Sequence, residues 1–315
     1  MAVLITGAAG FLGTALTQRF VNEGTTVLAT DFSDSGPAVS GKALSNVEYV
    51  KADIRDARTI RLLVERAGAE DPIIHLAGIL TAGCDRDPEL AIDVNVKGLL
   101  NVLAPLSEKP VRRVVFASTI GVYGRGLPQP INESMPIEPD GWYGLTKYSG
   151  EQTGLLYGRR YGVDFRAVRL AAVTGPGRKA GSGSASLFTS YIPEKAALGE
   201  PYEIEVTQDT AYPVVYIKDA VDAIATLAGA AQAPSRIYNI ASGRIVVNEM
   251  VAAVKTLVPD AKYTYKPVDD IMAVVSGYKE WAIDCTLAER ELAWRPTYSP
   301  DEMVSDIIDT VKSSQ

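Results

Sequence analysis

The chain has 315 residues, of which 47% are hydrophobic and 22% are charged, and its formal net charge is −7 at pH 7. These values are ordinary for a globular enzyme with one large domain or two modest ones, and the negative charge disfavours nucleic acid or an anionic membrane surface as a partner. With a single histidine, the chain cannot hold a multi-histidine metal site, and we expect no metal. The two cysteines, Cys84 and Cys285, lie far apart in the sequence and fit a reducing, cytoplasmic setting.

Short apolar runs typical of strands alternate with amphipathic helical stretches through the first half of the chain. The expected strands are 2–6, 26–30, 47–50, 72–76, 112–116 and 164–170, and the expected helices are 11–23, 56–68, 88–106 and 143–161. Alternation of this kind indicates a parallel sheet with helices on both faces. We therefore predict an α/β fold with a doubly wound Rossmann sheet in residues 1–170. No apolar run reaches the length that spans a bilayer, and we expect no membrane association.

The pattern changes beyond residue 171. A Gly/Ser-rich loop at 174–186 precedes shorter elements, namely strands near 203–206, 214–217 and 237–240 and helices near 185–198, 219–231, 247–257 and 299–312. We expect residues 171–315 to form a smaller α/β region that binds the substrate. Residues 214–240 are expected to return to the main sheet.

A glycine turn joins the first strand to the first helix. Gly7, Gly10 and Gly13 have the spacing G-x-x-G-x-x-G, and Phe11 and Leu12 open the helix. Glycines at these places permit a tight turn, backbone contact with a pyrophosphate and close packing of helix on strand. The same glycines could also serve a purely structural turn, so this motif alone is weak.

Asp31 lies at the end of the second predicted strand. A carboxylate there can accept hydrogen bonds from both ribose hydroxyls and repels a 2′-phosphate, and Phe32 and Ser33 offer no cation for such a phosphate. This favours NAD over NADP as the cofactor. The alternative role of Asp31 is a turn cap.

Tyr143 and Lys147 form a Y-x-x-x-K pair, which places both side chains on one face of a predicted helix. A nearby ammonium lowers the pKa of a phenol, and such a tyrosine can act as acid or base near neutral pH. In isolation this spacing is common on solvated helix faces. The preceding strand ends in Ala117-Ser118-Thr119-Ile120-Gly121-Val122-Tyr123-Gly124, which puts a hydroxyl where open α/β sheets bind ligands.

Together, the glycine turn, Asp31, the S-T-x-x-V-Y-G strand end and Y-x-x-x-K resemble the extended short-chain dehydrogenase/reductase superfamily, which includes epimerases, dehydratases and dehydrogenases. The resemblance implies that Thr119 is the catalytic hydroxyl, Tyr143 the general base or acid, and Lys147 the group that holds the nicotinamide ribose. Ser118 is the alternative hydroxyl and a further candidate substrate contact. The remaining cofactor contacts that the resemblance implies are Asp53, Ile54, Leu76, Ala77, Gly78, Asn95 and Ala117.

The second half of the chain departs from the nucleotide-sugar enzymes of this superfamily. They usually carry Asn after the sixth strand and Arg before an acidic-aromatic pair, whereas this chain has alanine after Leu170 and Tyr212 at the place of the Arg. A diphosphate would lose a charge-assisted contact. The region is more similar to short-chain L-threonine dehydrogenases and sugar-acid dehydrogenases, although the Gly-Thr-Thr-Asp-Tyr-like segment of the threonine enzymes is absent.

We therefore predict an NAD-dependent dehydrogenase that oxidises a secondary hydroxyl of a sugar acid, a hydroxy acid or a β-hydroxy amino acid. Ser182, Ser184 and Ser186 could contact substrate hydroxyls and Arg178 a carboxylate, although Arg178 could equally be a solvated loop charge. The alternatives are a nucleotide-sugar 4-epimerase or dehydratase that recycles its NAD, and a non-catalytic NAD-sensing protein. By resemblance, a homodimer that pairs helices 88–106 and 143–161 is expected. His75, in an apolar strand, is expected to be structural.

Overall fold

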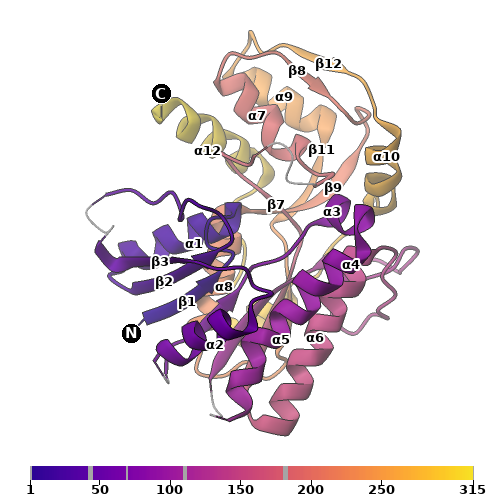
Figure 1. Ribbon diagram of the computed structural model, residues 1–315. Helices are drawn as coiled ribbons and strands as arrows, with labels where there is room; N and C mark the ends of the chain where they lie inside the picture. Colours follow the sequence, from indigo (N-terminus) through magenta and orange to yellow (C-terminus); the bar gives the residue numbers. More distant parts are fainter. Residues whose placement is uncertain (1, 42–44, 69, 109–111, 180–183, 315) are drawn as a thin grey trace.

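The computed structural model describes residues 2–41, 45–68, 70–108, 112–179 and 184–314 (Figure 1). Its main sheet has seven parallel strands in the order β10-β6-β5-β4-β1-β2-β3. They are β1 (Ala2–Thr6), β2 (Thr26–Asp31), β3 (Val47–Lys51), β4 (Ile73–His75), β5 (Arg113–Thr119), β6 (Asp164–Leu170) and β10 (Ile237–Ile240). The order reverses between β1 and β4, which is where open α/β sheets bind ligands at the carboxyl ends of the strands. The predicted doubly wound Rossmann sheet is confirmed.

Successive residues of each central strand pack into two separate cores, because side chains alternate between the faces of a sheet. Val3 and Ile5 belong to one core, and Leu4 belongs to the other. Helices α1 (Phe11–Asn22) and α8 (Ile217–Gly229) pack together on the first face. Helices α2 (Ala57–Arg66), α5 (Gly98–Leu103) and α6 (Trp142–Tyr161) cover the second face (Figure 1).

The predicted helix 88–106 consists of four short pieces. They are α4 (Pro88–Ala91), a π-helix (Ile92–Lys97), α5, and a 3₁₀ turn (Ala104–Ser107). Contrary to the sequence-based expectation, the run Pro88–Ser107 is long and apolar enough to cross a membrane by length and composition. A core helix passes the same test, and α5 packs against α2 and α6. This single run is therefore weak evidence for a membrane span.

A second region lies over the carboxyl ends of the main sheet. Its three-stranded sheet has the order β11-β9-β7 and its two-stranded sheet the order β12-β8. The strands are β7 (Ala172–Thr174), β8 (Tyr202–Ile204), β9 (Ala211–Tyr216), β11 (Gly243–Val246) and β12 (Tyr263–Tyr265). Helices α7 (Phe188–Ala197), α9 (Val247–Leu257) and α12 (Pro300–Ser313) pack against one another beside these sheets (Figure 1).

The expected return of 214–240 to the main sheet is half right. Strand β10 pairs with β6 as expected, but β9 pairs with β7 and β11 instead. The reason is a break at Ala171, where the chain leaves the main sheet after β6 and starts β7 in a new sheet. Every residue of β9 is buried, so the backbone N–H and C=O groups on both of its edges need hydrogen-bond partners. Strands β7 and β11 provide these partners.

The short elements α3 (Thr81–Arg86), α10 (Asp269–Val275) and α11 (Thr286–Leu292) were not expected. They span too few residues for a clear hydrophobic period.

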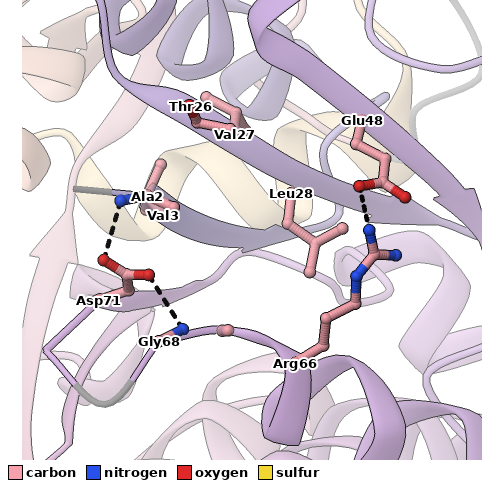
Figure 2. A pocket seen from close by; sticks show the side chains of 10 residues that line it. Ala2, Val3, Thr26, Val27, Leu28, Glu48, Arg66, Gly68 and Asp71 are labelled. Carbon is pink, nitrogen blue, oxygen red and sulfur yellow. Dashed lines mark hydrogen bonds and ion pairs between the residues drawn. The ribbon is translucent and has the colours of Figure 1, made fainter.

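A hollow of about 140 Å³ opens at the amino ends of β1 and β2 (Figure 2). Its polar groups are paired with one another, because Asp71 accepts from the backbone N–H groups of Ala2 (2.8 Å) and Gly68 (2.9 Å), and Arg66 pairs with Glu48. No predicted site residue lines this hollow. Gly7, Asp31 and Thr119 instead lie at the opposite, carboxyl ends of β1, β2 and β5.

Helix α6 packs so closely on β6 that Gly154 has no room for a side chain. A Cβ there would lie 2.1 Å from the ring of Phe165. Gly154→Ala should lower the free energy of unfolding by about 1–3 kcal/mol, because the overpacking outweighs the helix propensity of alanine. Gly229→Ala at the end of α8, where a Cβ meets nothing within 4 Å, is the matched control and should be neutral or stabilising by up to about 1 kcal/mol. Urea unfolding measures both, and equal effects would contradict the packing argument.

Candidate active site

The glycine turn brings two backbones into contact. Gly7 has φ +72°, and a Cβ on it would lie 2.6 Å from the backbone nitrogen of Ala77. A Cβ on Gly13 would lie 2.1 Å from the carbonyl oxygen of Gly7. Gly10 is the N-cap of α1, with no side-chain cap and no acidic residue in the first turn. The helix start, with Phe11 and Leu12, thus presents N–H groups and a positive dipole end that suit an anionic pyrophosphate.

Asp31 is placed beside this turn at the end of β2. Its carboxylate accepts hydrogen bonds from the N–H groups of Ala9 and Ser33, both at 3.1 Å. Asp31 therefore caps a turn, as in the alternative role considered from the sequence. A carboxylate has two oxygens, and each can still accept a further hydrogen bond from a ribose hydroxyl. Asp53 follows β3 and forms an ion pair with Arg55, at 2.5 Å. Together, these groups fit the adenosine half of NAD.

Asn95 fixes the segment that follows β4. Its side chain accepts from the N–H of Ile79 (2.7 Å) and donates to the carbonyl of Ile79 (3.1 Å) and to Thr146 Oγ1 (3.0 Å). A Cβ on Gly78 would lie 3.1 Å from Asn95 Oδ1 and 3.3 Å from Lys147 Nζ. Leu76, Ala77 and Gly78 therefore run past both the glycine turn and Lys147. Asn95 lies in the π-helix, a distortion found often at functional sites.

Two further predicted cofactor contacts have mainly backbone roles. Ile54 is buried, and a Cβ on Gly98 would lie 2.9 Å from its side chain. Its carbonyl accepts from Asn101 Nδ2, at 2.9 Å. The carbonyl of Ala117 accepts a hydrogen bond from Lys147 Nζ at 2.8 Å.

Lys147 is 3% exposed, and burial lowers its pKa to about 8. Its ammonium lies 4.8 Å from the ring centre of Phe116 and 5.7 Å from that of Tyr143. The sequence led us to expect that Lys147 lowers the pKa of the Tyr143 phenol. Instead, burial raises the pKa of this phenol, and the cation that opposes the rise is Arg178. The physical reason is that loss of water around a phenolate outweighs a charge lying over the ring.

Thr119 ends β5, and its Oγ1 accepts from the N–H of Gly121 at 3.1 Å. A Cβ on Gly144 would lie 2.1 Å from the carbonyl oxygen of Gly121, so the start of α6 touches the turn after β5. This contact places Tyr143, the neighbour of Gly144, close to the end of β5 that carries Thr119.

Ser118 does not fit the predicted substrate contact or the alternative catalytic role. It is 3% exposed, and its hydroxyl donates to Glu151 Oε1 at 2.5 Å. Neighbouring strand residues point to opposite faces of a sheet. Ser118 therefore points to the face of β5 that packs against Glu151, and Thr119 points to the opposite face.

Glu151 and Arg169 form a fully buried ion pair with a two-pronged contact of 2.9 and 2.7 Å. Arg169 also donates to the hydroxyl of Tyr123 (2.8 Å), which in turn donates to Asn239 Oδ1 (2.8 Å). The pair was not foreseen. Its signals in the sequence are an arginine inside an apolar strand and a glutamate four residues after Lys147.

Arg178 is 8% exposed, so the alternative of a solvated loop charge is wrong. Its guanidinium donates to Ser184 Oγ (2.5 Å) and to Ser186 Oγ and O (both 3.3 Å). Within the described ranges, its hydrogen-bond partners are serine and backbone oxygens and no carboxylate pairs with it, and burial lowers its pKa to about 10. Ser182 lies outside the described residues.

His75 and Cys84 are buried near Lys147. Thr6 Oγ1 lies 2.8 Å from His75 Nδ1, the His75 ring stacks on Phe116, and burial lowers the pKa of His75 to about 3. The structural interpretation of His75 is confirmed. The thiol of Cys84 donates to the carbonyl of Ile79 (3.3 Å), and burial raises its pKa to about 11, so it is not an activated thiolate.

Residues 3–241 match the family model described as the NAD dependent epimerase/dehydratase family. The chain is 28% identical to the mitochondrial L-threonine 3-dehydrogenase of Bos taurus, over 97% of this chain and 81% of that protein. It is 29% identical to a UDP-glucose 4-epimerase of Mycolicibacterium smegmatis, over 98% of each. The crystal structure of L-threonine dehydrogenase from Phytophthora infestans is 27% identical, covers 100% of both chains and superposes with a TM-score of 0.89.

The role of Asp31 predicts a change in cofactor preference. Asp31→Ser should weaken NAD binding about tenfold, because a charge-assisted contact to the ribose is lost, and should raise the NADP-to-NAD affinity ratio. Asp34→Ser, which removes an exposed carboxylate paired with Lys51, is the matched control and should change neither affinity. Fluorescence titration with both cofactors measures these values. An equal loss of affinity for NAD and NADP would contradict the assignment.

The lowered pKa of Lys147 predicts a pH-dependent stability difference. Below pH 8 the Lys147 ammonium is charged in both the folded and the unfolded chain, and burial of this charge opposes folding. Between pH 8 and 10.5 the folded chain loses the proton first, so the free-energy cost of burying the charge falls. Lys147→Met should therefore gain stability relative to the native chain near neutral pH, by up to roughly 3 kcal/mol, and this gain should shrink as pH rises. Urea unfolding of both proteins across this range tests the sign; a gain independent of pH would contradict it.

Proposed function

Because the chain belongs to the NAD-dependent epimerase/dehydratase family, we propose that it is a dehydrogenase that oxidises a secondary hydroxyl of a small carboxylate. The chain is an NAD-dependent enzyme of dehydrogenase or epimerase type, and NAD is its cofactor. The proposed substrate is a sugar acid, a hydroxy acid or a β-hydroxy amino acid. Cytoplasmic location is part of the proposal and rests on the two unpaired cysteines, of which Cys84 is buried and Cys285 half-buried.

The observation that carries the proposal is the buried guanidinium of Arg178. A buried cation without an anionic partner is costly, and its burial is explained if a substrate carboxylate completes the pair. The Arg178 guanidinium opposes the rise that burial causes in the pKa of Tyr143, and we propose that a carboxylate bound to Arg178 lies near this base. Ser186, which holds Arg178, is then a positioning residue for that carboxylate.

In the proposed mechanism, Tyr143 accepts the proton of the substrate hydroxyl as general base. Thr119 Oγ1, at the end of β5, donates a hydrogen bond to the substrate oxygen and so orients the carbon that reacts. Lys147, anchored on the Ala117 carbonyl, would hold the nicotinamide ribose, and the cation that opposes the raised pKa of the Tyr143 phenol is Arg178. The chemistry that NAD supplies when bound is acceptance of the hydride.

The main alternative is a nucleotide-sugar 4-epimerase or dehydratase, which returns its hydride and forms no net NADH. The relative from Mycolicibacterium smegmatis is named a UDP-glucose 4-epimerase. Tyr212 disfavours this alternative, because it stands where a diphosphate-binding arginine is expected and is buried among aromatic rings. The second alternative, an NAD-sensing protein without activity, gives no role to the Thr119, Tyr143 and Lys147 set.

A homodimer is also part of the proposal. Large apolar side chains are exposed on the stretch 88–106 and on α6, which contains the stretch 143–161 expected to pair with it across a two-fold axis. They are Ile92, Trp142, Leu145 and Leu156. Exposed apolar surface on neighbouring helices favours association with a second copy.

The proposal predicts net NADH formation with native protein and a panel of sugar acids, hydroxy acids and β-hydroxy amino acids. Tyr143→Phe should lower kcat at least about 100-fold, because the general base is gone, while NAD affinity stays within about twofold. Tyr148→Phe, one position past Lys147 on the same helix, is the matched control and should retain activity. Absorbance at the NADH band and NAD titration provide the two readouts.

Full activity of Tyr143→Phe would overturn the mechanism. Conversion of UDP-sugars without net NADH would favour the epimerase alternative, and NAD binding without turnover across the whole panel would favour the sensing protein.

A further inference from the structure

An aromatic wall lies beside the proposed substrate site and has no role in the mechanism above. It consists of Tyr212 on β9, Tyr278 after α10, and Trp281. The rings of Tyr212 and Tyr278 lie 5.1 Å apart, and those of Tyr278 and Trp281 lie 4.6 Å apart. Phe188 supports Tyr212 edge-on at 6.2 Å. The three rings of the wall therefore form one continuous, packed surface.

The wall faces the groups that carry the proposed chemistry. A Cβ on Gly121 would lie 3.7 Å from the hydroxyl of Tyr278 and 3.4 Å from Thr119 Oγ1, so both hydroxyls border the same point after β5. At the other end, Tyr212 packs against Phe188, which lies two residues beyond Ser186, and Ser186 accepts a hydrogen bond from Arg178. The wall thus reaches from Thr119 to Arg178.

Polar contacts hold the segment that carries Tyr278. Arg125, in the loop after β5, donates to the carbonyl of Ala273 in α10 (3.2 Å) and pairs with Asp140 (2.9 Å). Lys279 pairs with Asp209 at 2.8 Å, and its carbonyl accepts from Arg244 at 2.9 Å. Figure 1 shows α10 next to β9 at the side of the second region. These contacts hold the chain on both sides of Tyr278, so this part of the wall is a fixed boundary of the site.

The charges around the site limit the ligand further. Arg178 is buried and can neutralise one carboxylate, whereas Lys179, the next residue, is exposed. The wall adds ring faces and phenol hydroxyls but no second cation. A phosphate ester or a diphosphate would bring negative charge that the wall cannot neutralise. In addition, a long substrate anchored on Arg178 would have to pass the packed rings.

We infer that Tyr212 and Tyr278 set the length limit of the substrate, and that this substrate is a short, hydroxylated monocarboxylate bound between Arg178 and Thr119. The inference rests on the proposed function for the identity of the reacting hydroxyl. The phenol groups provide hydrogen bonds for substrate hydroxyls: among the described residues, no hydrogen bond uses either phenol oxygen. The ring faces exclude a longer chain or a nucleotide.

The experiment compares erythronate with the longer gluconate. Native protein should bind erythronate at least about tenfold more tightly in the presence of NAD, because gluconate meets the wall. Tyr278→Ala and Tyr212→Ala should each reduce this ratio about tenfold by opening space. Tyr278→Phe, which keeps the ring, should keep the ratio and weaken both ligands. Tyr161→Ala, at the exposed end of α6, is the control and should match native protein.

Calorimetric binding to the NAD-loaded protein and kcat/KM for NADH formation are measured on the same variants. A ratio that stays unchanged in both alanine variants, with NAD affinity retained, would overturn the inference. Native protein that binds gluconate as tightly as erythronate, or binds neither, would also overturn it. Length-selective binding that the alanine variants abolish, without turnover by native protein, would support the wall and refute the dehydrogenase function instead.

Discussion

The buried pair of Glu151 and Arg169 is the interaction on which the geometry of the site depends. Tyr143, Lys147 and Glu151 follow one another at four-residue spacing on α6, so the position of Glu151 determines where the other two side chains lie. Arg169 on β6 and Ser118 on β5 both hold that carboxylate, and the Thr119 hydroxyl follows directly on the same strand. A buried ion pair adds little net stability, but removal of either partner leaves an uncompensated charge. Its value here is the fixed distance between helix and strand.

Above this neutralised pair, the site holds cations that no protein carboxylate neutralises within the described ranges. Lys147 donates only to a backbone carbonyl, and Arg178 donates only to serine and backbone oxygens. Both side chains are buried, and burial lowers the pKa of each. In a chain of net charge −7, this arrangement concentrates positive potential where an anionic substrate or cofactor would bind. The cost of burying these charges unpaired supports the proposal that these residues form a functional site.

Much of the fold was predictable because its signals are local. The strands and glycine turn of the first half have unbroken apolar runs or fixed glycine spacing, and β6 was predicted with the bounds that the structure shows. The second region was harder, since β9 is buried at every residue and its sequence does not say which sheet it joins. The role of Ser118 was also inaccessible, because the sequence does not show that Glu151 lies across from it. The raised pKa of Tyr143 depends on burial, which sequence spacing cannot report.

The proposed function assigns the chemistry to the first region and the choice of substrate to the second. Thr119, Tyr143 and Lys147 stand on β5 and α6, which the buried pair joins rigidly. Arg178, Tyr212 and Tyr278 stand on segments after Ala171, outside the main sheet. Under the proposed function, a tyrosine on β9 in place of a diphosphate-binding arginine would alter which ligand fits without moving Tyr143 or Thr119. Under the proposed function, substrate identity should depend on the second region. Relatives that match nearly the whole chain bear names as different as threonine dehydrogenase and UDP-glucose epimerase, so the fold alone does not fix the substrate.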